Sequence, residues 1–349
     1  MAKYTKKQKR NDPSYRRNRK RSGVKDPLQK SLRYDITPGA VAKTSNYIDS
    51  FRDLSRVNRK LIRQGHTILV DSIEFAYTAS STAVGVVKVS ASTAGNTWAV
   101  HNAWVKGCAL WDEMQDLVLD VNPSVKGKWR DFKVQLEKSM GSGNTLNPID
   151  GADAPFTVGE WDYSMYVMPQ HDVDPGTGFP DDALQYTATL IGDDSNVAVG
   201  AIDGKRSLVK AYADSRATVQ DVDPNVPAAM STSFFNLLTD SGSQEPELAD
   251  IIEDENDEPP YDIDNYVGGS ASPGDVPFVQ SFGVASSGHP KGILPGFLAE
   301  CGLIKIAVEA FAPNGDPVAD LSSVFTDFVI KVNYAAGPKM GLMMTGMGQ

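Results

Sequence analysis

The stretch DFVIKVNY, residues 327–334, carries the clearest strand pattern in the chain. Its large apolar side chains occupy every second position and face away from polar ones: Phe328, Ile330, Val332 and Tyr334 against Asp327, Lys331 and Asn333. Because successive side chains of a strand point to opposite faces, this alternation predicts a strand with one buried face. The fold is therefore expected to contain a half-buried sheet.

The same period of two recurs along most of the chain. Alternating segments occur at 69–77, 117–121, 132–136, 161–168, 184–190 and 304–308, with weaker candidates at 84–92, 97–105, 207–212 and 277–284. About eleven strands, joined by connections rich in Gly, Pro, Asp and Asn and almost without helices, are typical of an all-β antiparallel sandwich or barrel. Residues 67–349 are expected to form this domain.

Several of the connections are longer than loops usually are. Residues 141–159, 169–183 and 214–276 are expected to form elaborated surface. The part from Glu245 to Asp264 carries ten acidic and no basic side chains, which predicts an exposed excursion at an outer surface or a rim. The Gly- and Met-rich end, Met340 to Gly348, fits either docking on a neighbouring subunit or a frayed terminus.

One helix is predicted, with Ser45 as its N-cap and Gly65 as its C-terminal stop. Its apolar side would hold Tyr47, Phe51, Leu54, Leu61 and Ile62, and a stripe of arginines would lie opposite: Arg52, Arg56, Arg59 and Arg63. Two readings of this stripe are weighed equally, a surface that binds nucleic acid and an ordinary solvated face. A membrane-surface helix is disfavoured because the apolar side has few large aliphatic residues. Residues 34–66 are thus expected to be a linker and an amphipathic helix.

Charge is divided unevenly along the 349 residues, although the formal net charge is only −10. Residues 1–33 hold thirteen Lys or Arg against Asp12 and Asp26, a net of +11, whereas the remainder holds 21 basic and 42 acidic side chains, a net of −21. Blocks of like charge repel one another, stay unfolded and commonly bind polyanions. Residues 1–33 are therefore expected to be a disordered arm.

This basic arm supplies most of the candidate nucleic-acid contacts. Guanidinium groups fork onto phosphates and binding releases counterions, so affinity should fall steeply with salt. Tyr4 and Tyr15 can stack on bases. A nuclear localisation signal fits the same clusters, and a solvated tail is a third, less favoured reading. The candidate residues of the arm are Lys3, Lys6, Lys7, Lys9, Arg10, Arg16, Arg17, Arg19, Lys20, Arg21 and Lys25.

Motifs of catalysis are absent from the sequence. The four histidines, His66, His101, His171 and His289, lack HExxH or paired metal spacing. There is no phosphate-binding loop, nucleophile elbow or dinucleotide fingerprint. We therefore expect a protein that is not an enzyme and holds no cofactor.

Two lesser alternatives stay open. Calcium could bind between subunits at paired carboxylates without an EF-hand pattern, although solvated loops are the better interpretation of Asp172/Asp174, Asp193/Asp194, Asp221/Asp223 and Asp262/Asp264. Cys108 and Cys301 stand alone, which argues against a disulfide framework and leaves only one bridge between them open. No apolar run reaches the length of a membrane span, and the charged first residues predict no secretory signal.

The chain as a whole resembles the single jelly-roll capsid proteins of small non-enveloped viruses. It is most similar to those of circular single-stranded DNA viruses, of the smacovirus or bacilladnavirus kind. The resemblance is carried by the clusters Lys6 to Arg10 and Arg16 to Arg21, by PGFL at 295–298 followed by CGLIKI at 301–306, and by a last strand that ends in a Gly- and Met-rich tail. Its motifs are few and not specific.

The resemblance implies an eight-stranded jelly roll that assembles in many copies into an icosahedral shell. Its arms would point inward to package viral nucleic acid, single-stranded DNA above all. The protein would belong to the virion, with passage through the host nucleus during assembly as an option if the host is eukaryotic. Two rival functions remain: a cellular nucleic-acid-binding protein with a basic tail, and a β-sandwich enzyme or carbohydrate-binding module. Neither needs a closed particle.

Overall fold

The computed structural model describes residues 28–79, 85–124, 131–141, 143–157, 159–168, 184–194, 204–215 and 278–348. Several predictions fall outside these residues. They concern the arm cations from Lys3 to Lys25, the acidic excursion within 214–276, the connection 169–183, and three of the four carboxylate pairs (Asp172/Asp174, Asp221/Asp223 and Asp262/Asp264).

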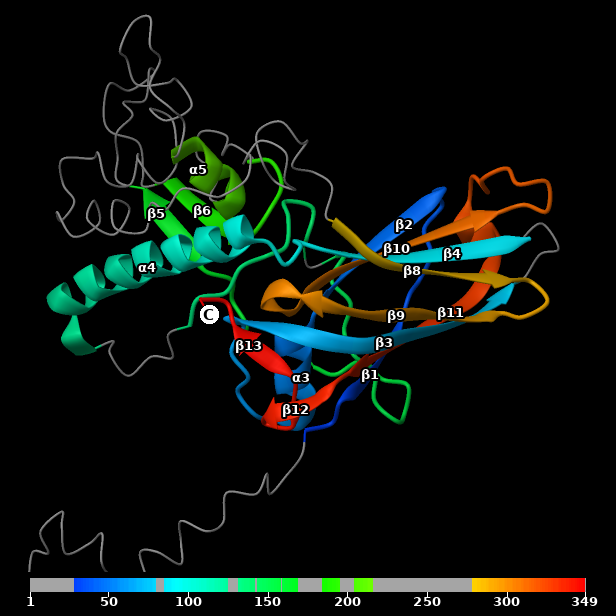
Figure 1. Ribbon diagram of the computed structural model, residues 1–349, viewed down its shortest axis with the longest axis horizontal. Coiled ribbons are helices and arrows are strands. Elements are labelled where there is room, and N and C mark those ends of the chain that lie inside the picture. The colour runs from blue at the N-terminus through cyan, green and yellow to red at the C-terminus, as the bar shows by residue number, and fades with distance from the viewer. Residues whose placement is uncertain are drawn as a thin grey trace, which may run out of the picture.

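Two antiparallel sheets form the main body (Figure 1). In the first, β11 (Phe325–Tyr334) lies between β1 (Ser31–Asp35) and β3 (His66–Ala79), while β9 (Lys291–Ala299) pairs with β3. The short β13 (Met344–Gly346) pairs with the beginning of β3, and β12 (Ala336–Lys339) precedes it. The second sheet has the order β2 (Lys43–Asp49), β10 (Leu303–Phe311), β4 (Val86–Thr93) and β8 (Phe278–Ser286). The prediction of antiparallel sheets is confirmed.

Apolar side chains from both sheets fill one core. In β11, Phe328, Ile330, Val332 and Tyr334 are all buried, as their alternation predicts. The rings of Phe75 and Phe328 stack with their centroids 6.1 Å apart. The strands predicted at 69–77, 84–92, 277–284 and 304–308 correspond to β3, β4, β8 and β10, so the sequence pattern located most of the second sheet.

Strands β8 and β9 join the two sheets through a hairpin, in which Ser286 and His289 form a bridge. Gly292 of β9 lies directly against the ring of Phe75, where a Cβ would overlap the ring atoms. The backbone of β9 can approach β3 this closely because Gly292 has no side chain. Strand β9 was not predicted, since Gly292, Pro295 and Gly296 interrupt its alternation.

A second hydrophobic core is formed mainly by residues that lie between β4 and β8 in the sequence. It contains the helices α4 (Trp98–Val121) and α5 (Leu208–Ser215) and a three-stranded sheet of β5 (Met165–Met168), β6 (Leu184–Thr189) and β7 (Gly204–Ser207). Strands β5 and β6 are antiparallel, and β6 and β7 are parallel. Figure 1 shows α4, β5, β6 and α5 together on one side of the main body.

These helices contradict part of the prediction. The strands expected at 97–105 and 117–121 both lie within α4, and the one expected at 207–212 lies largely within α5. The Thr97 side chain caps α4 by accepting from the amide of Val100 at 3.3 Å. Neither α4 nor any other described helix is long and apolar enough to span a membrane.

The segment predicted as a strand at 132–136 is extended, but it does not have one buried and one exposed face. Its backbone bonds to β6, with the Gln135 amide donating to Ala188 O at 3.0 Å. Lys133, Gln135 and Glu137 are buried along with the apolar residues between them. Lys305 Nζ lies 2.6 Å from Glu137 Oε1, and the Tyr47 hydroxyl also donates to that atom, so the second core surrounds a paired charge.

Candidate nucleic-acid interface

Helix α3 (Ser50–Asn58) is the element predicted to carry four arginines, and it is shorter than expected. Residues 43–49, expected to be linker and first helical turn, form β2 and pair with β10. The N-cap is therefore Asp49 and not Ser45, and its carboxylate accepts from the Arg52 amide at 3.1 Å. The helix ends at Arg59, well before Gly65, in a left-handed conformation with φ 52° and ψ 38°.

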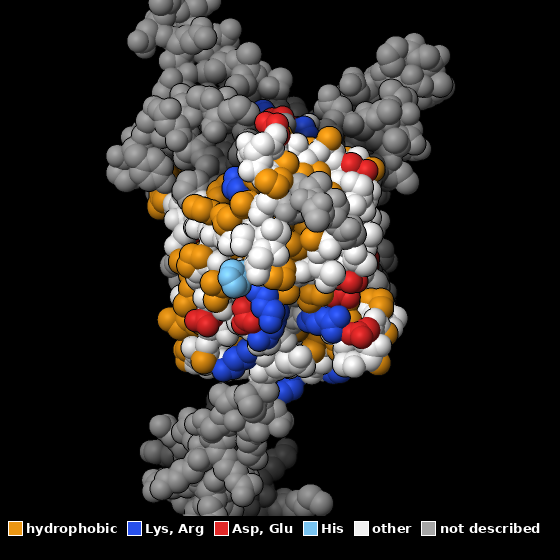
Figure 2. All heavy atoms as spheres, turned by 90° about the vertical axis from the view of Figure 1, so that its right-hand side faces the viewer, with side chains coloured by type: hydrophobic (Ala, Val, Ile, Leu, Met, Phe, Trp, Pro, Cys, Tyr) orange, Lys and Arg blue, Asp and Glu red, His pale blue; other side chains and the backbone are white. Residues whose placement is uncertain are grey.

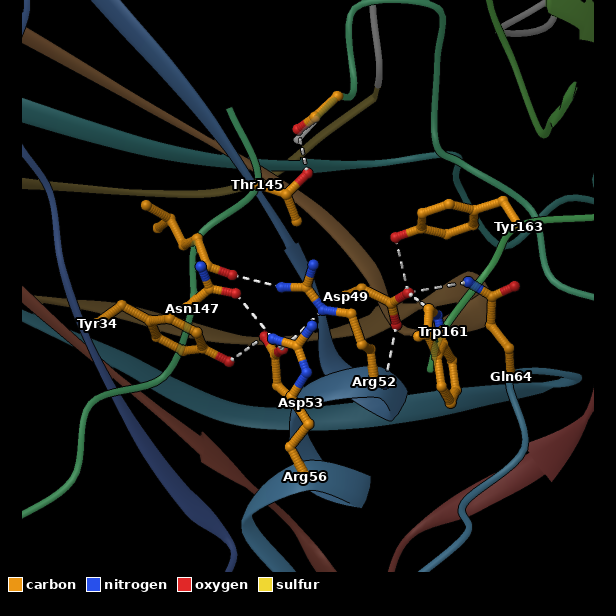
Figure 3. A network of polar contacts seen from close by, with 12 residues as sticks. Tyr34, Asp49, Arg52, Asp53, Arg56, Gln64, Thr145, Asn147, Trp161 and Tyr163 are labelled. Carbon is orange, nitrogen blue, oxygen red and sulfur yellow. Dashed lines mark hydrogen bonds and ion pairs between the residues drawn. The ribbon is translucent and has the colours of Figure 1, made fainter. Parts of the chain in front are cut away.

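Arg52 and Arg56 do not form part of an exposed stripe. Arg52 is 7% exposed; its Nε donates to Asp53 Oδ1 at 2.9 Å and its Nη2 donates to the carbonyl of Leu146. Arg56 Nη1 donates to Asn147 Oδ1 at 2.7 Å and lies 3.7 Å from the same Asp53 oxygen (Figure 3). The prediction of a solvent-facing stripe is wrong for these two residues, because a buried carboxylate on the helix itself draws both guanidinium groups inward.

The two aspartates of this network are also buried. Asp53 accepts from the Tyr34 hydroxyl at 3.0 Å, and Asp49 accepts from Trp161 Nε1 at 3.0 Å and from the Tyr163 hydroxyl at 3.1 Å (Figure 3). Burial raises the pKa of Asp53 to about 6, and it also raises the pKa of Asp49. Burial and the neighbouring Arg52 charge lower the pKa of Arg56. Burial therefore acts against the charged forms of both carboxylates and of Arg56, and two aspartates stand opposite two arginines in the cluster.

Exposed cations gather where α3 ends. Arg59 and Lys60 are exposed, and the Arg63 side chain, 57% exposed, lies 3.5 Å from Asp131. Arg59 and Arg63 thus have the exposure expected of them, whereas nucleic-acid binding by them stays a prediction. Within the described part of the chain, the Arg59 guanidinium has no carboxylate partner.

The beginning of the described chain is attached to the same helix end. Leu28 is buried, and the Gln29 amide donates to Asn58 Oδ1 at 2.6 Å while Asn58 Nδ2 donates to Gln29 O at 3.3 Å. The boundary predicted at residue 33 is too late, because β1 already begins at Ser31. Residues 1–27, with eleven Lys or Arg, therefore join the body beside Arg59 and Lys60.

The far end of the sandwich has a different charge pattern. Figure 2 views the end that carries the β8–β9 hairpin and the β10–β11 connection, and acidic side chains lie beside the basic ones there. Glu309 lies 2.8 Å from Lys43 Nζ and 3.4 Å from Lys88 Nζ. Pairing of this kind leaves less cationic charge for a polyanion than the end of α3 offers.

The one predicted carboxylate pair within the described residues is Asp193/Asp194, and each of its members has a cation partner. Asp193 lies 3.4 Å from Lys138 Nζ, and Asp194 lies 3.4 Å from Arg206 and accepts from the Ser207 amide. Each carboxylate of this pair thus has a cation as its partner within the chain, and calcium between subunits stays an untested alternative. Among the described residues no group of three or more His, Cys, Asp or Glu is placed to hold a metal ion. Cys108 and Cys301 are both free thiols.

Four residues of this region were missed from the sequence: Asp49, Asn58, Lys60 and Trp161. One available signal was Asp53, which stands one and three positions from the two arginines that it binds. No signal foretold Trp161, which comes from a distant connection. No protein-family model matches the chain, and no curated protein or solved structure is significantly similar to it.

Proposed function

We propose that this chain is a viral capsid protein that assembles into a closed icosahedral shell and packages single-stranded DNA. The observation that carries the proposal is the junction at α3. A segment with eleven Lys or Arg and two Asp joins the body where Arg59 and Lys60 are exposed. A cationic sequence that is covalently joined to the body next to exposed cations suits a polyanion better than either part alone.

The strand order supports a single jelly roll. Eight strands, taken in chain order, are β1, β2, β3, β4, β8, β9, β10 and β11. The first, eighth, third and sixth lie side by side in one sheet, and the second, seventh, fourth and fifth lie in the other. This interleaving is the order of a jelly roll built of two Greek keys, a fold found in viral capsids.

The charge division supports a container. An acidic body does not attract nucleic acid to its own surface, while a cationic segment neutralises the phosphates of the cargo. Assembly would be driven by apolar burial between copies of the chain and made possible by that neutralisation. The partners are then further copies of this chain and the genome, and the location is the virion.

The rival functions receive less support. A cellular nucleic-acid-binding protein with a basic tail would share the junction at α3, but it would not need the interleaved sheets. A carbohydrate-binding module or sandwich enzyme would leave the cationic region without a role. The fold alone does not decide between these functions, because sandwiches host many of them.

The test uses the full chain and a variant that lacks residues 1–27. Full-length protein mixed with single-stranded DNA should form closed particles in negative-stain electron micrographs, and its affinity should fall by about 0.7 log units per neutralised phosphate per decade of salt. The shortened variant should lose most of that salt dependence while its thermal unfolding is unchanged. Single-stranded RNA in place of DNA tests the genome type.

Two results would count against the proposal. If the full chain binds DNA but stays a monomer or small oligomer at every protein and salt concentration, the cellular function is correct. If the shortened variant binds as tightly and with the same salt slope, residues 1–27 have no part in binding.

A further inference from the structure

A cleft of about 230 Å³ lies between the end of α3 and the connection that carries Trp161. The helix and the turn after it form one wall, and residues 159–161 form the other. The lining residues are Arg52, Ser55, Arg56, Arg59, Lys60, Leu61, Gly159, Glu160 and Trp161. The lining thus contains four cations and one carboxylate, that of Glu160.

The cations at the base of the cleft are held by carboxylates behind them. Arg52 and Arg56 lie 2.9 Å and 3.7 Å from Asp53 Oδ1, and the buried Asp49 acts on both of them electrostatically. The Arg56 side chain is 9% exposed, and its buried Nε has no hydrogen-bond partner among the described residues. An unpaired donor on a buried cation is costly, so an anion that enters the cleft would be stabilised.

The rim adds a second cationic layer and an apolar surface. Arg59 and Lys60 are exposed on the rim, and Leu61 beside them is 44% exposed. Trp161 is half-buried and fixed in orientation, since its Nε1 donates to Asp49 at 3.0 Å and Lys133 Nζ lies over one face of its ring, 5.0 Å from the centroid. The indole is therefore an oriented aromatic surface next to a group of phosphate-binding side chains.

Arg59 also occupies a backbone position that favours glycine. Its φ of 52° lies in the left-handed region, where a non-glycine residue costs roughly 1 kcal/mol. Strained residues of this kind gather at binding sites, where the side chain has a use that offsets the strain. The left-handed backbone is thus a second observation, besides the exposed charge, that marks Arg59 as a binding residue.

We propose that this cleft binds one nucleotide of the packaged single strand, with the phosphate on Arg59, Lys60 and Arg56 and the base against Trp161 and Leu61. The inference rests on the proposed function and extends it, because it names the chemical unit that the body itself recognises. Bases of single strands can leave the stack and lie on aromatic side chains, and every base has such a face. A cleft of this volume has no room for a duplex.

Photo-crosslinking with the full-length protein tests the site directly. The probe is a thymidine oligonucleotide that contains 5-iodo-deoxyuridine. Digestion with a protease that cleaves at acidic residues separates residue 161 from the basic segment. Crosslinks are expected at Trp161 as well as within residues 1–27.

Variants measure the phosphate and base parts separately. Arg59→Gln combined with Lys60→Gln should lower the yield at Trp161 about 5-fold or more, because two charge-assisted contacts are lost from an exposed rim that the fold does not need. Lys291→Gln is the matched control, since Lys291 is an exposed lysine at the hairpin end of the sandwich. An oligonucleotide with abasic sites should compete at least about 5-fold less well than thymidine, which is the effect of losing one stacked base.

Four results would overturn the inference, and the first three separate it from the proposed function. Crosslinks confined to residues 1–27, with DNA binding intact, would remove the cleft and leave the proposed function standing. Equal competition by abasic oligonucleotide or by inorganic phosphate would show an anion site without base recognition. Equal competition by an acidic peptide would assign the cleft to a protein partner. Failure of the full chain to bind DNA at all would remove the proposed function and the inference together.

Discussion

The side-chain amide of Asn58 forms hydrogen bonds with both the backbone N–H and the backbone C=O of Gln29. Asn58 Oδ1 accepts from the Gln29 amide at 2.6 Å, and Asn58 Nδ2 donates to the Gln29 carbonyl at 3.3 Å and to the Leu54 carbonyl at 2.9 Å. The last residue of α3 thus fixes the backbone of Gln29, the second described residue of the chain.

Removing this amide should loosen the junction without changing any charge. Asn58→Ala loses three hydrogen bonds and should lower the free energy of unfolding by about 1–2 kcal/mol. The amides of residues 29–31 should exchange hydrogen faster, as mass spectrometry can measure. Asn314→Ala is the control, because Asn314 is exposed and bonds only within its own turn. Equal exchange in both variants would show that Asn58 does not hold the junction.

Truncation should reveal where the basic segment ends. A chain that lacks residues 1–27 should unfold at the same temperature as the full chain. A chain that lacks residues 1–33 also loses Leu28 and Leu32, which are 4% and 1% exposed, and most of β1. Burial of each leucine contributes about 2 kcal/mol, so the longer deletion should be strongly destabilising in a denaturant titration. Equal stability of both truncations would contradict the observed position of β1.

Arg52 should act on stability and not directly on nucleic-acid binding. Arg52→Met leaves the buried Asp53 with only the more distant Arg56 and should cost about 3–5 kcal/mol of unfolding free energy. Arg33→Met is the matched control, since Arg33 is 42% exposed and its partners Asp35 and Asp153 are exposed as well. The control should stay within about 1 kcal/mol of wild type. Unchanged stability with lost DNA affinity in Arg52→Met would restore Arg52 as a direct contact.

Arg59→Gly should stabilise the fold. Glycine adopts the left-handed C-cap without the Cβ penalty, so the free energy of unfolding should rise by about 0.5–1 kcal/mol. Lys60→Gly, at the next exposed position, has no such strain to relieve and should lower it. Calorimetry of the two variants checks the contrast. A loss of stability in both would mean that the backbone at Arg59 is not strained.

Glu300 should make stability depend on pH. Burial raises the pKa of Glu300 from 4.5 to about 7, against the opposing effect of the Thr93 hydroxyl and the Gly95 amide. Because the folded-state pKa is raised, this contribution to stability is complete below about pH 4.5 and is lost as pH rises through about 7. Glu300→Gln should therefore leave stability at pH 4.5 unchanged and raise it at pH 8 by up to about 3 kcal/mol. Parallel pH profiles for the two proteins would exclude this ionisation as the cause.

The strands with uninterrupted alternation were predictable from the sequence. Strands β10 and β11 place an apolar residue at every second position, and β3 does so from Ile73 to Tyr77, after an interruption at Asp71; these apolar residues are buried. Strand β9 escaped because Pro295 and two glycines break its pattern, although tertiary contact with Phe75 requires one of those glycines. The excess of basic residues in residues 1–27 can be read directly from the sequence.

Helix α4 was read as strands for a physical reason. Both of its ends contain β-branched and aromatic residues, such as Val100, Val105 and Val121, which favour strands when considered alone. Packing of Ala103, Leu110 and Trp111 into the second core overrides that preference. Local propensity could not reveal this, because the core is assembled from residues far apart in the chain.

The candidate site was predictable only at its exposed edge. The sequence predicts an exposed row of arginines on the helix, which is correct for the exposure of Arg59 and Arg63 and wrong for Arg52. Burial of Arg52 depends on its hydrogen bonds to Asp53 and to the carbonyl of Leu146, and only Asp53 is near it in the sequence. The cleft itself depends on Trp161, more than a hundred residues away from its other wall.

Thr93 at the end of β4 and Phe278 at the start of β8 are directly paired neighbours in one sheet. The chain therefore leaves the second sheet after Thr93 and re-enters it beside the same residue, so the order of the eight strands does not depend on the length of the segment between them. Within that segment, Asn144, Leu146 and Ile149 bond to the backbone of β2 and β1 and are tied to the sandwich. Exchange of loops between distant homologues should therefore be tolerated away from these three residues and should destabilise the sandwich where it removes them.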